Sequence, residues 1–348
     1  MSTNLPLDSD IRKIDSVIVT SIASPNPVLT QIAQETGERN IRFYVIGDRK
    51  SPSNFILDNC HYYSLENQKR LSFKYAELCP EASYARKNIG YLLALADGAQ
   101  SLLETDDDNF PECGFLTDRC SSVKGRQPVG DGWVNAYGYF SDVNIWPRGF
   151  PLEDVQNCTS TEFVENTSFC PIQQGLADDN PDVDAVYRLL FPLPIKFRKE
   201  TPLILRKGQW CPFNSQNTVF FRETFPLLYL PATCSFRMTD IWRSFVAQRI
   251  LWTCGWSLSF HASTVRQERN EHNLMRDFSD EVSGYLNNAA IANRLENLEL
   301  KSGPEAMSDN IQTCYTELLR MELVKPEELS LLSAWLEDLQ QLKHSAAG

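Results

Sequence analysis

Short apolar runs alternate with amphipathic segments over the first hundred residues. The runs at 16–22 (SVIVTSI) and 41–46 (IRFYVI) predict two buried strands, because each is short, rich in β-branched residues and followed by small polar residues. Between them, Asn26 before Pro27 is typical of a helix start, and Gly37 predicts the end of that helix. The order strand, helix, strand therefore opens the chain.

The same alternation continues as far as residue 105. A helix is expected over 65–78, and a second over 83–99, where apolar residues recur at helical spacing and Gly98 closes the segment. The run at 101–105 (SLLET) predicts a third strand, which leads directly into a triplet of aspartates. This order predicts an α/β fold with a mostly parallel sheet and right-handed crossovers.

The second part of the chain is less regular. Gly, Pro, Trp and Asn are frequent from 110 to 231, where we expect short strands at 133–140 and 217–221 within loops that shape a pocket. A helix is expected over 239–252, and polar helices follow residue 277. We therefore divide the chain into a first domain, 11–277, and a helical C-terminal extension, 278–348.

Composition narrows the functional class. Asp and Glu outnumber Lys and Arg by 45 to 33, a net charge of −12, which argues against nonspecific nucleic-acid binding. No apolar run is long enough to span a membrane, and the N-terminus lacks the features of a signal peptide. We therefore expect a soluble, cytoplasmic protein, or a soluble piece of a longer one. The ten cysteines form no CxxC pair, so we expect free thiols rather than structural zinc.

The aspartate triplet is the sharpest chemical feature. In extended backbone, Asp106 and Asp108 would point the same way from the end of a buried strand. Open α/β sheets bind ligands at the carboxyl ends of their strands. Two carboxylates there predict a site for Mn²⁺ or Mg²⁺ that also holds a diphosphate, with Asp107 among the donor-binding residues. The competing interpretation is a solvated acidic turn.

Four further residues point to the same crevice. Thr20 follows the first strand and Asp48 follows the second, where a carboxylate could accept hydrogen bonds from a ribose or from uracil. Arg86 and Lys87 lie in the first turn of the helix before the acidic strand, where cations oppose the helix dipole. Binding of a phosphate or a nucleobase carbonyl would explain them, and a solvated charged turn is the alternative.

At this point the chain resembles a known family. The order VIVTSI, VIGDRKSP, SYARKNIGYLLALADGA and LLETDDDNFP resembles the GT-A class of nucleotide-sugar glycosyltransferases, and more closely the STELLO family. Later segments resemble that family too, from IWPRGFPLEDV to VRQERNEHNLMRDF, so the resemblance covers about 15–278. A fainter similarity links the ARKNIGY and DDD segments to UDP-arabinopyranose mutases. STELLO proteins are Golgi proteins with an N-terminal membrane anchor, which this sequence lacks, so the Golgi lumen is expected only for a piece of a longer protein.

The resemblance implies a GT-A-like, Rossmann-like sheet flanked by helices and a role for each candidate residue. Thr20 and Asp48 would hold uridine, and Arg86 and Lys87 would meet uracil or the diphosphate. Asp106 would contact ribose or a metal-bound water, and Asp108 would bind the metal. Asp240, at the start of a helix facing the acceptor, would be the catalytic base. His272 would complete the metal site, with His261 as a rival.

Two segments between these positions remain open to either interpretation. Arg148, in WPRGF, is either a phosphate partner or part of an aromatic turn. The acidic stretch 178–182 is either a sugar-binding loop or a solvated turn.

Three functions remain open. The first is metal-dependent sugar transfer from a UDP-sugar to an unknown glycan, protein or small-molecule acceptor. The second is a non-catalytic scaffold that binds nucleotide sugars and partners, and the third is a UDP-sugar mutase. The C-terminal helices also offer a surface for a homo-oligomer.

Overall fold

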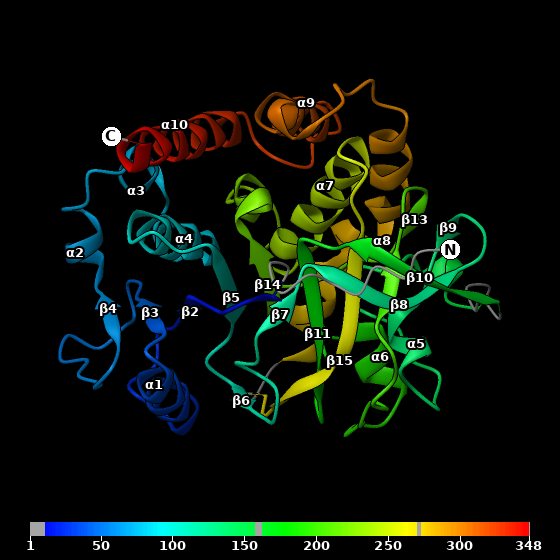
Figure 1. Ribbon diagram of the computed structural model, residues 1–348, viewed down its shortest axis with the longest axis horizontal. Coiled ribbons are helices and arrows are strands. Elements are labelled where there is room, and N and C mark those ends of the chain that lie inside the picture. The colour runs from blue at the N-terminus through cyan, green and yellow to red at the C-terminus, as the bar shows by residue number, and fades with distance from the viewer. Residues whose placement is uncertain (1–10, 157–161, 270–272, 348) are drawn as a thin grey trace.

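A large mixed sheet runs through the molecule, with helices on both of its faces (Figure 1). The structure is a computed structural model that describes residues 11–156, 162–269 and 273–347. The sheet has eleven strands in the order β10-β8-β12-β15-β11-β14-β5-β2-β3-β4, and β6 pairs with β15 beside this path. Helices α9 and α10 lie along one side of the molecule, beyond α4 and α7 (Figure 1).

The strands of the large sheet are β2 Ser16–Thr20, β3 Arg42–Ile46, β4 His61–Tyr63, β5 Ser101–Thr105, β6 Asn109–Pro111, β8 Ser122–Pro128, β10 Phe163–Phe169, β11 Ile172–Asp178, β12 Leu203–Leu205, β14 Asn217–Phe221 and β15 Leu258–Gln267. Two small ladders pair β1 Ile11–Arg12 with β7 Arg119–Cys120 and β9 Gly132–Trp133 with β13 Gln209–Trp210. The α-helices are α1 Pro27–Arg39, α2 Leu65–Gln68, α3 Lys74–Leu78, α4 Lys87–Ala96, α5 Ala136–Tyr139, α6 Ala185–Leu190, α7 Thr239–Thr253, α8 Leu274–Glu296, α9 Met307–Arg320 and α10 Glu327–Ala347.

The α/β class predicted from the sequence is confirmed. The expected strands at 16–22, 41–46 and 101–105 form β2, β3 and β5, which with β4 make a parallel half-sheet. Beyond β5 the directions are mixed, because β14 runs antiparallel to both β5 and β11. The expectation of a mostly parallel sheet therefore holds for the first half only.

Alternate side chains of the parallel strands serve two different layers. Ile18 of β2 faces the hydrophobic cluster that contains α4, whereas Val17 and Val19 face the cluster that contains α1. Gly90 lets α4 lie close to the sheet, since a Cβ there would come within 2.6 Å of Ile18 and 2.9 Å of Ile46. The sheet is thus covered by helices on both faces, as its continuous apolar strands require.

The expected helix at 65–78 is wrong in one respect, because it is two short helices, α2 and α3. The second begins after Phe73, where the carboxylate of Asp338 in α10 accepts hydrogen bonds from the backbone of Lys74 and Tyr75 at 3.0 and 2.9 Å. A cap supplied by a residue far along the chain leaves no local pattern.

The expected strand at 133–140 is also wrong. Only its first residue is extended, and α5 follows. Asn135 starts that helix, since its side chain accepts a hydrogen bond from the backbone of Gly138 at 2.9 Å.

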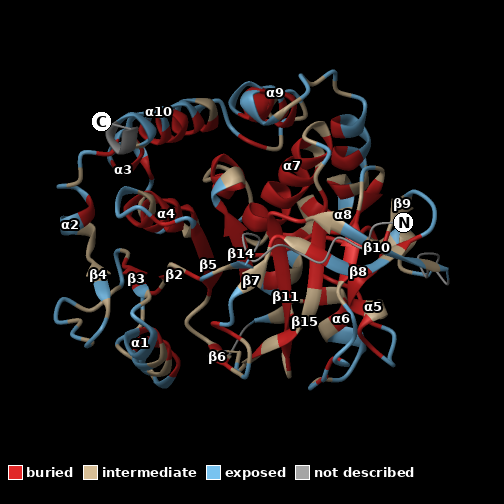
Figure 2. Cartoon of the chain, in the orientation of Figure 1, coloured by how far each residue is buried: buried red, intermediate tan, exposed pale blue. Residues whose placement is uncertain are grey.

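The C-terminal helices share the main hydrophobic core with the first half-sheet. Trp335 of α10 and Ile311 of α9 lie in the same cluster of buried residues as Ile18 and Leu102. The centre of the sheet and α7 are the most thoroughly buried elements (Figure 2). The boundary at 277 stays a prediction. None of the helices in the described part of the chain is long and apolar enough to cross a membrane.

Candidate functional site

The aspartate triplet lies where β5 leaves the sheet. Extended backbone ends at Thr105, and the triplet then forms a turn that leads into β6. The expected alternation of Asp106 and Asp108 along an extended strand is therefore wrong. The turn still gathers the three carboxylates at the carboxyl end of the parallel half-sheet, which is the usual ligand-binding edge of such folds.

Lys87 fixes the first of these carboxylates. Its ammonium group is fully buried and donates to Asp106 Oδ1 at 3.1 Å, to the carbonyl of Thr105 at 2.7 Å and to the carbonyl of Ser215 at 3.2 Å. Tyr84 donates a second hydrogen bond to the same Oδ1, at 2.7 Å. Asp106 is 29% exposed, so one side of the carboxylate is held and the other is accessible.

Asp107 and Asp108 are held less completely. Asp107 accepts a short hydrogen bond from Ser21 at the end of β2, and burial raises the pKa of the Asp107 carboxyl. Asp108 accepts one hydrogen bond at Oδ2, from Gln267 Nε2 at 3.0 Å, while its Oδ1 is buried without a hydrogen-bond partner. Burial and the charge of Asp106 raise the pKa of Asp108 to about 7.

A cation would satisfy this arrangement. An ionised carboxylate oxygen that is buried and has no donor is costly, and a bound cation removes that cost. Within the described residues, no group of three or more His, Cys, Asp or Glu side chains is arranged to hold a metal. Asp106 and Asp108 could therefore contribute only part of a coordination shell, and His272 lies outside the described residues.

The two strand-end positions expected at the base-binding side lie on neighbouring strands. Thr20 ends β2, and Asp48 follows β3. The Asp48 carboxylate accepts hydrogen bonds from the backbone of Ala82 and Ser83, both at 2.9 Å. Asp48 thus joins the β3 loop to the turn before α4, while remaining partly exposed.

Arg86 lies almost fully buried behind that turn. It donates to Gln68 Oε1 at 2.7 Å and to the carbonyl of Cys79 at 3.0 Å, and its Nη2 has no hydrogen-bond partner. Arg86 and Lys87 are therefore not a solvated turn. They are anchored inside the fold, and Arg86 keeps one buried donor available.

Arg148 and Asp240 form a separate charged group at the start of α7. Arg148 donates twice to Asp240, at 3.0 Å to each oxygen, and twice to Asp182, at 2.8 and 2.7 Å. Burial alone would raise the pKa of Asp240, but the charge and hydrogen bonds of Arg148 lower it to about 2. Arg148 therefore pairs with two carboxylates of its own chain, and Asp240 is held ionised.

Comparison with known proteins points to one family. A family model described as STELLO glycosyltransferases matches residues 237–347, which include Asp240 and exclude the aspartate triplet. The chain is 28% identical over 318 residues to "Probable glycosyltransferase STELLO2" of Arabidopsis thaliana, and 26% identical over 325 residues to "Probable glycosyltransferase STELLO1" of the same plant.

The resemblance to the STELLO family is confirmed. The two alignments cover 84% and 86% of this chain but 41% of each relative, so the chain spans about two fifths of the length of these STELLO proteins. The STELLO proteins named above are described as probable glycosyltransferases.

Two residues that were not selected from the sequence connect the charged groups of this STELLO-like chain. The Tyr84 hydroxyl lies 2.6 Å from Ser215 Oγ, and Ser215 donates through its backbone N–H and its hydroxyl to Asp240 Oδ2, both at 3.2 Å. Asp106 and Asp240 are thus joined through Tyr84 and Ser215. Tyr84 stands two residues before Arg86, so its neighbours were the available signal; Ser215 had none.

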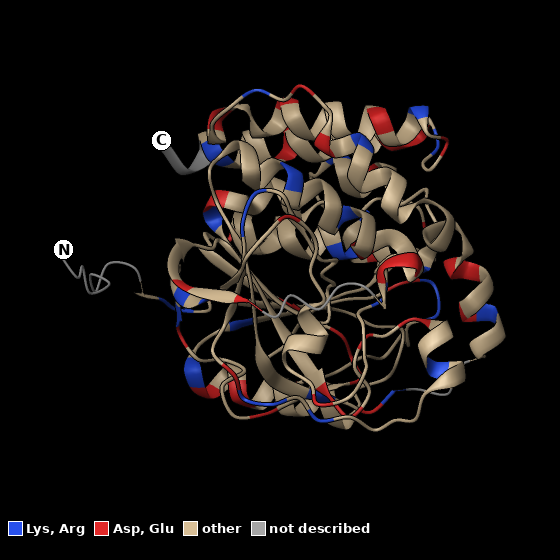
Figure 3. Cartoon of the chain, turned by 90° about the vertical axis from the view of Figure 1, so that its right-hand side faces the viewer, with Lys and Arg blue, Asp and Glu red and all other residues tan. Residues whose placement is uncertain are grey.

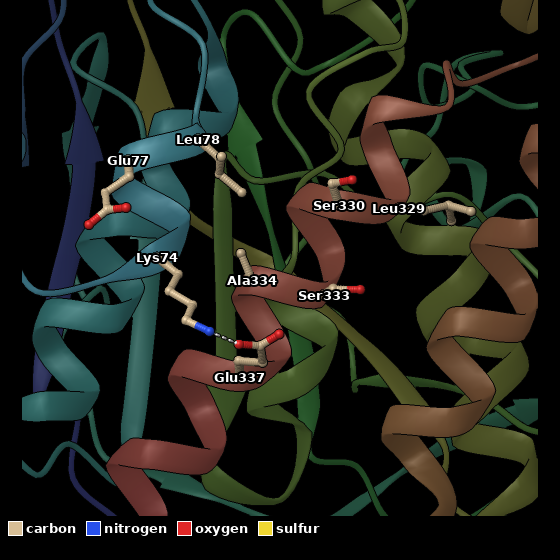
Figure 4. A pocket seen from close by; sticks show the side chains of 8 residues that line it. All are labelled: Lys74, Glu77, Leu78, Leu329, Ser330, Ser333, Ala334 and Glu337. Atoms are coloured by element: carbon tan, nitrogen blue, oxygen red, sulfur yellow. Dashed lines mark hydrogen bonds and ion pairs between the residues drawn. The ribbon is translucent and has the colours of Figure 1, made fainter.

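A cavity of about 500 Å³ lies elsewhere, between α3 and α10 (Figure 4). Its lining includes Lys74, Leu78 and Ser330 and shares no residue with the aspartate turn. Charged residues of both signs are interspersed over the molecule, so the acidic excess forms no single face in this view (Figure 3). The candidate site rests on the aspartate turn rather than on this cavity.

Proposed function

We propose that this chain is a glycosyltransferase that takes a sugar from a UDP-sugar with the help of Mn²⁺ or Mg²⁺. The observation that carries the proposal is the Asp108 carboxylate, whose buried Oδ1 has no hydrogen-bond donor at the ligand-binding edge of the sheet. The similarity to STELLO glycosyltransferases supports the same activity class.

Asp106 and Asp108 fit a divalent cation as oxygen ligands, with oxygens of the donor completing its coordination. Such a cation offsets the charge of the diphosphate leaving group. The chain's own residues prepare the site: Lys87 and Tyr84 hold Asp106, and Gln267 holds Asp108 through one oxygen. Because these partners are already in place, ligand binding costs little reorganisation.

The base and ribose of the donor are assigned to the edge formed by β2 and β3. Thr20 and Asp48 lie at the ends of those strands, and Arg86 keeps a buried Nη2 donor without a partner near the turn that Asp48 holds. An arginine donor suits a carbonyl oxygen, and an aspartate acceptor suits an imide N–H. Uracil offers both groups, which is why a UDP-sugar is proposed.

Asp240 is the proposed base for the acceptor hydroxyl, but its surroundings limit that role. Arg148 keeps the pKa of Asp240 near 2, whereas an efficient general base has a pKa close to the working pH. This pairing favours a second candidate function, a nucleotide-sugar-binding scaffold without transferase activity. A UDP-sugar mutase would show itself by converting the donor in the absence of any acceptor.

Calorimetry with UDP, UDP-sugars and other nucleoside diphosphates, with and without Mn²⁺, tests the proposal. We expect UDP to bind more tightly than CDP, Mn²⁺ to strengthen binding, and Asp108→Asn to remove the Mn²⁺ dependence without unfolding the protein. Asp118→Asn is the matched control, because Asp118 is exposed. Equal Mn²⁺-dependent affinity in Asp108→Asn and the unmodified chain, or tightest binding of a purine nucleotide, would reject the assignment.

A further inference from the structure

Four arginines lie among the segments around α6, α7 and α8, and three of them have a carboxylate partner. Arg148 is shared by Asp182 and Asp240, as described above. Arg237 Nη2 lies 2.8 Å from Glu281, and Arg269 Nη2 lies 2.7 Å from Asp277. The fourth is Arg188, near the end of α6.

Arg188 differs from the other three in its charge partners, because a buried nitrogen without a hydrogen-bond partner also occurs in Arg237, at Nη2. Its Nη2 donates to the carbonyl of Pro181 at 2.8 Å, but its Nε is buried without a hydrogen-bond partner. No ion pair joins Arg188 to a carboxylate among the residues that the structure describes. The two acids whose charges act on Arg188 are engaged by other groups: Asp182 by Arg148, and Glu281 by Arg237 and by the backbone of Ala185 at 2.7 Å.

The surroundings of Arg188 oppose its charge. Burial, together with the positive charges of Arg269 and Arg237, lowers the pKa of Arg188 to about 9, although Asp182 acts in the other direction. A buried cation without a counter-ion destabilises a fold. Charge that the protein itself leaves uncompensated is characteristic of positions where a ligand supplies the opposite charge.

The arginines are placed next to the proposed donor site. Gln267, at the end of β15, donates to Asp108, and two residues later Arg269 exerts its charge on both Asp108 and Arg188. Asp277 and Glu281 stand one turn apart on α8, so they hold Arg269 and Arg237 side by side. A small anion beside Arg188 would therefore also be attracted by the charges of Arg237 and Arg269. Arg269 would stand between that anion and Asp108.

We propose that Arg188, flanked by Arg237 and Arg269, binds a phosphate group of a ligand. Guanidinium groups bind phosphate oxygens with directed, paired hydrogen bonds, and the buried Nε of Arg188 is a donor that such an oxygen would satisfy. The phosphate comes either from the diphosphate of the donor, in which case the inference rests on the proposed function, or from a phosphorylated acceptor.

The test compares the unmodified chain with Arg188→Gln and Arg188→Lys, and with Arg249→Gln as the matched control. Arg249 is also partly buried and also donates to main-chain carbonyls, those of Leu295 and Leu298, but it lies on the far part of α7. Thermal unfolding is followed as inorganic phosphate is added, against chloride at equal ionic strength. Calorimetry then gives the affinities for UDP and for uridine.

We expect phosphate to raise the Tm of the unmodified chain, of Arg249→Gln and, less strongly, of Arg188→Lys, but not of Arg188→Gln. Without ligand, Arg188→Gln should melt no lower than the unmodified chain, because it removes an uncompensated buried charge; a merely structural arginine would give a lower Tm.

The affinities identify the source of the phosphate. If the diphosphate is the source, Arg188→Gln weakens UDP binding at least tenfold and leaves uridine binding unchanged. If UDP binding is unchanged while the response to phosphate is lost, a phosphorylated acceptor is the source. If phosphate raises the Tm of Arg188→Gln as much as that of the unmodified chain, the inference is overturned, whatever the affinity for UDP. Absence of UDP binding together with an Arg188-dependent phosphate response would reject the proposed function and leave this site standing.

Discussion

Asp108 and Asp240 are two aspartates at the ends of regular elements, and their surroundings are opposite. Asp108 has one hydrogen bond, one buried oxygen without a donor, and a pKa raised to about 7 by burial and by Asp106. Asp240 has two bonds from Arg148 and two from Ser215, and a pKa lowered to about 2. One carboxylate oxygen of Asp108 therefore lacks a hydrogen-bond partner within the chain, whereas both carboxylate oxygens of Asp240 have such partners.

Whether a charged side chain has partners within the chain distinguishes residues that bind a ligand from residues that support the fold. The type of residue alone does not make this distinction, since both residues here are aspartates. A carboxylate whose partners are all internal contributes to stability, and one that lacks partners contributes to ligand binding at a cost in stability. By this criterion the aspartate turn and Arg188 are places for ligands, while Arg148, Lys87 and Asp240 position the groups around them. The predictions that follow test this separation.

The largest effect is expected from Arg148→Ala. The substitution leaves Asp182 and Asp240 without their shared cation, and breaking a buried ion pair in this way costs about 3–5 kcal/mol. Urea unfolding followed by circular dichroism measures the loss, with Arg222→Ala as an exposed control. A loss below about 1 kcal/mol would mean that Arg148 is not the internal partner of these acids.

Asp240→Asn tests whether a fully paired carboxylate also does chemistry. If Asp240 is the base, turnover of a UDP-sugar falls by about 100-fold or more while UDP affinity is kept. If Asp240 only supports Arg148, stability falls and turnover is nearly intact. Steady-state kinetics beside UDP calorimetry distinguishes the two results, and a near-normal rate would turn attention to Asp179 and Asp182 or to a mechanism without a protein base.

The acid stability of the chain tests the paired state of Asp240 directly. Because the folded pKa lies below the unfolded one, Asp240 contributes stability above pH 4 that is lost as the pH falls from about 4 to 2. At about 1.4 kcal/mol per pH unit, the loss is roughly 2 kcal/mol. Urea unfolding at pH 5, 4 and 3 should show the unmodified chain losing more stability than Asp240→Asn, and parallel losses would contradict the pairing.

The smallest effect, and the one of opposite sign, is expected from Asp108→Asn without metal. The raised pKa means that ionised Asp108 destabilises the folded chain as the pH rises from about 4 to 7. At pH 8 we therefore expect Asp108→Asn to be more stable by at least about 1 kcal/mol. The exposed Asp118→Asn should change stability by less than about 0.5 kcal/mol. A loss of stability in Asp108→Asn would place Asp108 with the supporting residues.

The sequence was a good guide wherever the signal was local. The apolar runs that form β2, β3 and β5 and the cap at Asn26 could be identified because strand period and capping depend on neighbouring residues. The helix break before α3 could not be predicted, because Asp338 caps it from the other end of the chain.

The candidate site was predictable only as a set of positions. Asp106 and Asp108 could be selected because they follow a buried strand, but not the turn that they form. The internal pairing of Arg148 with Asp182 and Asp240 joins residues 34 and 92 positions apart, and the isolation of Arg188 depends on which acids are already engaged. Sequence patterns register residue type and spacing; they do not register whether a charge has been neutralised.

The C-terminal helix α10 supplies two carboxylates that cap segments far earlier in the chain. Asp338 caps α3, and buried Glu328 accepts hydrogen bonds from the backbone of Ala232 and Thr233. Asp338 therefore ties α3 to α10, and Glu328 ties the segment before α7 to the same helix. α3 can therefore acquire its cap only after residue 338 has been synthesised, and loss of the second half of α10 would remove a cap from a helix more than 250 residues earlier.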